Sequence, residues 1–224
     1  MPNEDLPDFF LPWHPDPGLR FEALLPALSA IEEAISHQSD QLTLRAQARL
    51  RRRGASSDEM FNDLAVLHHE TQELLSRVLR SGFLVSLWSL FESSIQELVE
   101  YVRVERKLAL GLDGQRSFLD QTNRFFRTTV NIHPFPNKEE RKQLDTLRRF
   151  RNALAHHDGN IAKVPKELIA DEGLVRSFCL TGDSHEFAVP SARYVRASVE
   201  LIGRVSQSLA GKVLALMPSQ NDAA

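Results

Sequence analysis

The chain has 224 residues, of which 42% are hydrophobic and 25% charged, an ordinary globular composition that is long enough to bury a core. Its formal net charge of −3 excludes a polyanion-binding surface over the whole molecule, so any contact with nucleic acid requires a local basic patch. The single cysteine, Cys179, excludes an intrachain disulfide and a cysteine metal cluster. Neither a long apolar run nor a secretory signal is found, so we expect a cytoplasmic protein without a membrane span.

Residues 1–18 contain five prolines interleaved with aromatic side chains, and this pattern predicts an extended arm that packs across the body or a partner subunit, with a disordered tail as the alternative. The apolar spacing then becomes helical from Phe21 to Arg53, with Pro26 expected in the first turn or at a kink. Cations gather at the end of this helix, and two interpretations stay open: a solvated helix end, or contacts with RNA phosphates. The cations are Arg45, Arg49, Arg51, Arg52 and Arg53.

Ser56-x-x-Glu59 has the spacing of a capping box and predicts the start of the next helix. The helical pattern continues nearly to Leu110, with a kink or break expected near Ser81-Gly82. Its second half is the most apolar segment of the chain and predicts a central core helix. The apolar positions are Leu84, Leu87, Trp88, Phe91, Ile95, Leu98, Val99 and Val102. Glu92 lies at the edge of this stripe and needs a partner, because an unpaired buried charge is costly.

A shorter helix is predicted around residues 115–127, followed by a loop over 131–137 and a helix from Lys138 to His157. Residues 175–180 and 185–189 read as two strands of a small β-hairpin, and a last helix follows Pro190-Ser191. We therefore predict an all-α fold, a helical bundle of four or more long helices with a small accessory β-hairpin before the last helix. The bundle is expected to form a single domain over residues 19–217, followed by a disordered tail over 218–224.

The end of the predicted helix 138–157 carries Arg151, Asn152 and His156 just before Asp158-Gly159, a pair that stops helices. Asn152 and His156 are four residues apart and share one face. Arg151 and His156 are five apart and differ by about 140° at 3.6 residues per turn. Arg151 instead shares the predicted buried face, where an apolar residue would favour stability. The other members of that face are Leu144, Leu147, Leu154 and Ala155.

These residue types suit the binding and cleavage of a phosphodiester. Histidine is the usual general acid or base near neutral pH, and the arginine fork matches phosphate oxygens. Asn152 is suited to orient the imidazole or contact the ribose. Cleavage of RNA by its own 2′-hydroxyl profits from a base and an acid together, which a two-fold dimer supplies from two copies of His156. The alternative interpretation is structural, with Arg151 paired with Glu92 and His156 an ordinary helix-end residue.

The chain resembles the HEPN superfamily of prokaryotic proteins over about residues 60–215. Arg151-Asn152-Ala153-Leu154-Ala155-His156 matches that family's arginine, polar residue, three residues and histidine. Ser86-Leu87-Trp88-Ser89-Leu90-Phe91-Glu92-Ser93 is similar to the aromatic-plus-glutamate helix of several HEPN branches. The order of motif helix, hairpin and final helix is also similar.

This resemblance implies a homodimer formed through the motif helices and a metal-independent endoribonuclease that needs no cofactor. It implies a role in toxin–antitoxin, abortive-infection or other phage-defence systems, with RNA as substrate and a cognate antitoxin protein as a further partner. Arg151 and His156 would be catalytic and Asn152 would assist, giving a 2′,3′-cyclic phosphate and a 5′-hydroxyl. Some HEPN proteins bind nucleotides or act as scaffolds, so a non-catalytic module that binds a nucleotide, RNA or protein stays an alternative.

Further residues are expected to support this site. Glu92 would orient Arg151, and His157 with Asp158 resembles an oriented base, although a helix cap explains Asp158 equally well. The RNA backbone would be held by Arg148, Arg149 and the cluster Arg51, Arg52 and Arg53. His69 and Glu73 are spaced as two metal ligands would be, but two ligands make a poor site, so a solvated helix face is preferred and no metal is expected.

Overall fold

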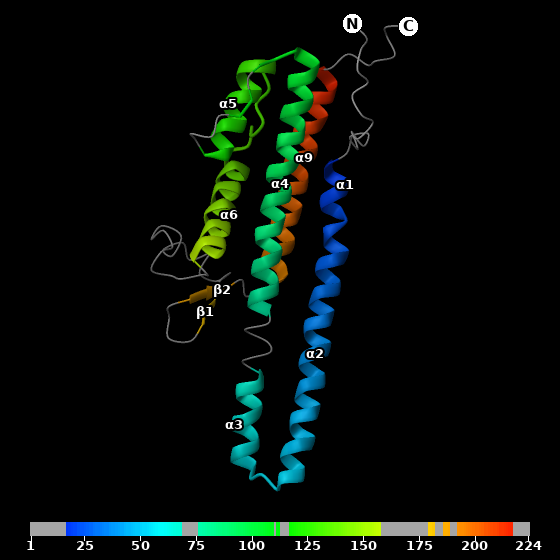
Figure 1. Cartoon of the computed structure of the whole chain (residues 1–224), viewed down its shortest axis with the longest axis vertical. Helices are drawn as coiled ribbons and strands as arrows, with labels where there is room; N and C mark the ends of the chain where they lie inside the picture. Colours follow the sequence, from blue (N-terminus) through cyan, green and yellow to red (C-terminus); the bar gives the residue numbers. More distant parts are fainter. Residues whose placement is uncertain are drawn as a thin grey trace, which may run out of the picture.

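The computed structural model describes residues 17–68, 76–109, 111–112, 117–157, 179–181, 186–188 and 192–216. The fold of these residues is all-α (Figure 1). The helices in chain order are α1 (Pro17–Glu22), α2 (Leu24–Arg53), α3 (Ser57–His68), α4 (Ser76–Arg106), α5 (Phe118–Val130), α6 (Lys138–His157) and α9 (Ala192–Leu216). None of these helices is long and apolar enough to cross a membrane.

The first two helices are separated at Ala23 because Pro26 has no N–H to donate to the carbonyl of Glu22. Pro26 therefore lies in the first turn of α2, as predicted. Residues 1–16 of the predicted arm and the tail over 218–224 lie outside the described residues. The prediction that residues 1–18 are not helical is wrong for residues 17 and 18, since α1 begins at Pro17. Proline is tolerated there because the first helical N–H has no intrahelical partner.

A capping box joins α2 to α3, as predicted. Gly54 ends α2 with φ 67° and donates its N–H to the Arg51 carbonyl at 3.2 Å. The Ser56 N–H donates to Glu59 Oε2 at 2.9 Å, and the Glu59 N–H donates to Ser56 Oγ at 3.3 Å. The end of α2 and α3 together project beyond the bundle (Figure 1).

Of the kink or break predicted near Ser81-Gly82, the break is wrong, because α4 passes through both residues as one helix from Ser76 to Arg106. A glycine costs a helix only about 1 kcal/mol. The buried Leu84 and Leu87 that follow it hold the segment against the bundle. Residues 69–75, between α3 and α4, lie outside the described residues.

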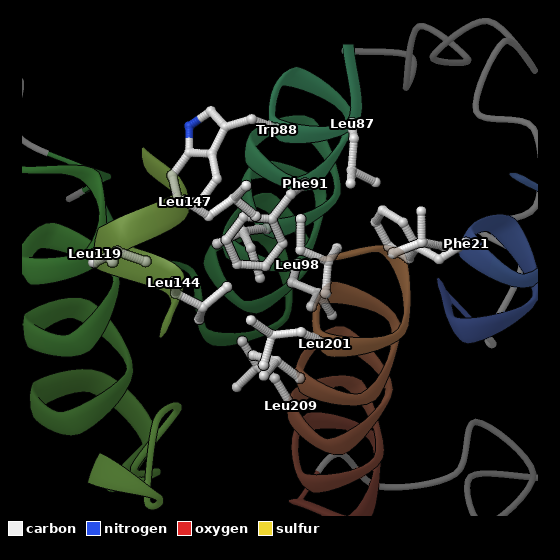
Figure 2. Packing of buried hydrophobic residues seen from close by; sticks show 14 of the residues in the cluster. Phe21, Leu87, Trp88, Phe91, Leu98, Leu119, Leu144, Leu147, Leu201 and Leu209 are labelled. Atoms are coloured by element: carbon white, nitrogen blue, oxygen red, sulfur yellow. The ribbon is translucent and has the colours of Figure 1, made fainter. Parts of the chain in front are cut away.

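The core is built around α4, as the apolar stripe predicted (Figure 2). Trp88 and Phe91 are 1% and 0% exposed, and their rings meet edge to face with centroids 5.3 Å apart. α9 packs against α1 and α4, and α6 packs against α4 and α9. Arg106 Nη2 donates to the Leu216 carbonyl at 3.4 Å, so α4 and α9 end together and run parallel. α6 runs in the opposite direction (Figure 1).

Two three-residue strands, β1 (Cys179–Thr181) and β2 (Glu186–Ala188), pair antiparallel with Leu180 opposite Phe187. These six residues do not establish the accessory β-hairpin predicted over residues 175–189. The rest of that segment lies outside the described part of the chain. The structure therefore confirms the all-α class and does not confirm the accessory hairpin.

Candidate active site

The helix that carries the candidate residues forms as predicted from Lys138 to His157. Asn137 caps its start, since Asn137 Oδ1 accepts from the N–H groups of Glu139 at 2.9 Å and Glu140 at 3.4 Å. One side of α6 is buried against the core through Leu144, Leu147, Phe150 and Ala153. The predicted wheel is wrong for Ala155, which is exposed because the buried side turns toward Phe150 and Ala153. The last turn of α6 therefore presents part of its surface to solvent.

Arg151 is half-buried in the last two turns of α6. Its Nη1 donates to Asn152 Oδ1 at 3.0 Å. Its Nε is buried and has no hydrogen-bond partner among the described residues. A buried donor without a partner costs about 1–3 kcal/mol, so this side chain is not placed for maximal stability. The unpartnered Nε supports the expectation that an apolar residue would favour stability at this position, which stays a prediction.

The hydrogen bond to Asn152 bears on the angle between Arg151 and His156. α6 stays helical through both residues, so the two Cα positions keep the separation of about 140° expected at 3.6 residues per turn. The guanidinium nevertheless turns toward Asn152, which shares its face with the exposed His156 one turn later. The structure thus joins the Arg151 guanidinium to the Asn152 amide, and the spacing of four residues puts Asn152 and His156 on one face of α6.

Glu92 does not orient Arg151, contrary to expectation, since no ion pair joins them in the part of the chain that the structure describes. The reason is the register of the antiparallel helices. Phe150 meets Tyr194, with ring centroids 6.2 Å apart, and Arg204 faces Glu140 at 3.9 Å. α4 and α9 end together, so the α6–α9 contacts also set the level of α4 against α6. Counted back from the ends of α4 and α9, Glu92 lies level with the second turn of α6. That level is about 13 Å along the axis from Arg151, at 1.5 Å per residue.

The two other residues expected to support the site, His157 and Asp158, lie at the end of α6 and just beyond it. His157 is the last residue of α6, and its side chain is outside the described part of the structure. Asp158 also lies outside the described residues, as do His69 and Glu73. Among the residues that are described, no group of three His, Cys, Asp or Glu side chains comes together as a metal site.

Arg148 and Arg149, predicted to hold RNA, are both anchored by Asp145. Arg148 donates from Nε and Nη2 to Asp145 Oδ1 at 3.1 and 2.8 Å. Arg149 donates from Nε to Asp145 Oδ2 at 2.8 Å. Sharing one carboxylate fixes two guanidinium groups one turn before Asn152, which pre-organises them for anionic oxygens.

A hollow of about 480 Å³ between the start of α5 and α6 contains both arginines, and we call it the α5–α6 groove. Five cationic side chains line it against two carboxylates, Asp120 and Asp145. The cations are Lys138, Arg141, Lys142, Arg148 and Arg149. The Ser117 hydroxyl, which donates to Asp120 at 2.6 Å, lowers the pKa of that carboxyl, and Arg141 and Arg148 lower it further. The groove is therefore a local basic surface on an acidic chain.

The sequence interpretation missed Lys138, Arg141 and Lys142, although a signal was present. Polar residues follow one line along α6 at alternating spacings of four and three, which is one helical face. Its members are Lys138, Lys142, Asp145, Arg149, Asn152 and His156. This face leads directly from the groove to the candidate catalytic residues.

The cluster Arg51, Arg52 and Arg53 forms the last turn of α2, at the end of the molecule beyond the bundle (Figure 1). A second hollow of about 440 Å³ there is lined by Arg45, Ala48, Arg49, Arg52 and Arg53, without Arg51. The structure does not bring this cluster to the end of α6.

The chain was compared with family models, curated proteins and solved structures, and none of them matches the chain. The HEPN resemblance thus rests on the residues of this chain alone.

Proposed function

We propose that this protein is a metal-independent endoribonuclease of the HEPN type that acts as a toxin or anti-phage defence effector. The observation that carries the proposal is the arrangement at the end of α6. Arg151 has a buried Nε without a partner among the described residues, and it turns its fork toward Asn152 on the face of the exposed His156. An arginine with a buried, unsatisfied donor on the same helix end as an exposed histidine is the residue combination expected where an anionic ligand binds.

Each residue has a role in the proposed reaction. The 2′-oxygen attacks the adjacent phosphorus as a histidine takes its proton, and the bond from phosphorus to the 5′-oxygen breaks as a second histidine donates a proton to it. The products are a 2′,3′-cyclic phosphate and a 5′-hydroxyl, and no water or metal enters this step. Arg151 stabilises the charge on the phosphate oxygens, while Asn152 holds the guanidinium in place.

The second histidine is proposed to come from a second copy of the chain in a two-fold dimer built around the ends of α6. In the described part of the chain, the large exposed apolar side chains lie on other helices. These are Leu44, Phe61, Val66, Val78, Val104 and Leu216. A contact through α6 would therefore be largely polar. Light scattering during size exclusion is expected to give the mass of a dimer, and a strictly monomeric, active enzyme would contradict the composite site.

The test of the activity is cleavage of end-labelled RNA by the purified protein in EDTA. His156→Ala is expected to lower the cleavage rate at least about 100-fold, the usual contribution of a general acid or base. His37→Ala is the matched control, since His37 is an exposed histidine on α2. A polynucleotide kinase is expected to label the downstream product without phosphatase treatment, because that product carries a 5′-hydroxyl. Equal cleavage by the His156 variant and the control would refute the proposal.

The second candidate function is a non-catalytic module that binds RNA, a nucleotide or a protein. The observation that favours it is the α5–α6 groove, whose basic side chains do not depend on His156. Expression in bacteria separates the two functions. A ribonuclease toxin is expected to arrest growth, and His156→Ala is expected to relieve the arrest. Unimpaired growth, together with a purified protein that is inert on several RNAs, would favour the binding module.

A further inference from the structure

The α5–α6 groove lies beside the candidate catalytic residues on the same helix face. We propose that it is the binding track for the phosphate backbone of single-stranded RNA and feeds the strand toward Asn152 and His156. This inference rests on the proposed function for its direction, from the groove to the site. Its binding step is tested separately from cleavage.

The first argument is the way the charges of the groove are held. Both carboxylates are engaged with arginines, since Asp145 binds Arg148 and Arg149, and Asp120 binds Arg141. Arg149 uses only Nε in its contact with Asp145, and among the described residues no partner is found for its two terminal nitrogens, which can each donate. The carboxylates therefore act as anchors that fix the arginines without neutralising all five cations of the groove.

The second argument concerns the two lysines. Lys138 and Lys142 are exposed, and neither makes an ion pair with any residue in the described ranges. Two adjacent lysines without a counter-charge repel each other, so an anionic ligand is favoured there. Lysine is also a flexible point charge that follows a phosphate chain of variable geometry.

The third argument is the length of the charged face. Lys138 and His156 are separated by about 27 Å along α6, at 1.5 Å per residue. A single phosphate or a mononucleotide occupies only a small part of that distance. The five cations of the groove are spread from Lys138 to Arg149, about 16 Å along the helix at 1.5 Å per residue, which matches a linear polyanion. The face continues to Asn152 and His156, which suits a phosphodiester strand.

The binding test uses full-length protein with His156→Ala, which prevents cleavage, and a fluorescein-labelled oligouridylate observed by anisotropy. Lys138→Ala/Lys142→Ala is compared with Arg127→Ala/Arg196→Ala, which removes two exposed cations that do not line the groove. We expect the groove variant to bind about 25-fold more weakly at about 0.1 M salt and to lose about 1.4 from the slope of log K against log salt. The control is expected to bind like the parent.

The outcomes separate the two proposals. Equal binding by the groove variant and the control overturns the inference, as does a loss that occurs only with Arg49→Ala/Arg52→Ala at the end of α2. Displacement of the RNA by polyglutamate at equal charge concentration overturns it too, because the groove would then be a general polyanion surface. Groove-dependent binding with no cleavage by the protein that retains His156 sustains the groove as an RNA-binding surface, and it refutes both the nuclease and the delivery of the strand to His156. Thermal melting checks that each variant is folded.

Discussion

Replacement of Arg151 by methionine is expected to raise the stability of the protein while abolishing RNA cleavage. Methionine keeps an unbranched stem of similar reach and removes the buried Nε that has no partner among the described residues. Removal of that donor is worth about 1–3 kcal/mol, and the lost bond from Nη1 to Asn152 offsets about 0.5–1.5 kcal/mol of it. A net gain of about 1 kcal/mol corresponds to a rise in Tm of about 2–4 °C for a chain of this size.

The assay is urea unfolding followed by circular dichroism, at one protomer concentration because association shifts apparent stability. Asn152→Ala serves as the contrast. It removes the acceptor of Arg151 Nη1, so it is expected to lower stability by about 1 kcal/mol instead of raising it. A loss of more than about 1 kcal/mol in Arg151→Met would refute the reasoning. The guanidinium would then be a structural group with a partner, as in the structural interpretation of this residue.

Three further predictions concern the frame that holds the site. Leu147→Ala, at a core position that is 1% exposed, is expected to cost about 2–5 kcal/mol in urea unfolding, and a cost below about 1 kcal/mol would contradict the packing. Ser117→Ala removes the cap of α5 and should cost about 1 kcal/mol; no change in Tm would argue against the cap. Folding lowers the pKa of Asp120, mainly through the hydrogen bond from the Ser117 hydroxyl. The ionised Asp120 therefore stabilises the folded protein above the ordinary pKa of about 3.8. This stabilisation is lost as the pH falls through the lower pKa of the folded state. Asp120→Asn should therefore lose less stability than the wild type between about pH 5 and pH 2, and identical losses would dispute this.

The sequence predicted the parts of the fold that depend on local pattern. The bounds of α6 followed from helix formers between a loop and a stop signal, and the core position of α4 followed from its apolar stripe. The break near Gly82 was predicted wrongly because local propensity was weighed without tertiary burial. The cost of one glycine, about 1 kcal/mol, is smaller than the gain from burying the leucines that follow it.

The candidate site divides in the same way. Arg151, Asn152 and His156 could be proposed as a site from the sequence because they lie within two turns of one helix. The pairing of Glu92 with Arg151 failed because it depended on the register of α4 against α6, which core packing decides and no local pattern encodes. The groove was missed because Asp120 comes to it from α5, and its ion pair with Arg141 of α6 places an acidic anchor among cations that looked like an ordinary solvated face.

The two sides of α6 divide stability from the proposed chemistry. Leu144, Leu147, Phe150 and Ala153 supply the buried side, whereas the line from Lys138 to His156 lies on the other side. Substitutions of the exposed members of that line, Lys138, Lys142 and His156, remove a charge or an imidazole without removing a buried side chain, so their effects on RNA binding or cleavage are not effects of unfolding. Arg151 differs, since it lies on the buried side and turns its fork toward the polar one. That position explains why it is the residue of α6 at which a gain of stability and a loss of function are expected from one substitution.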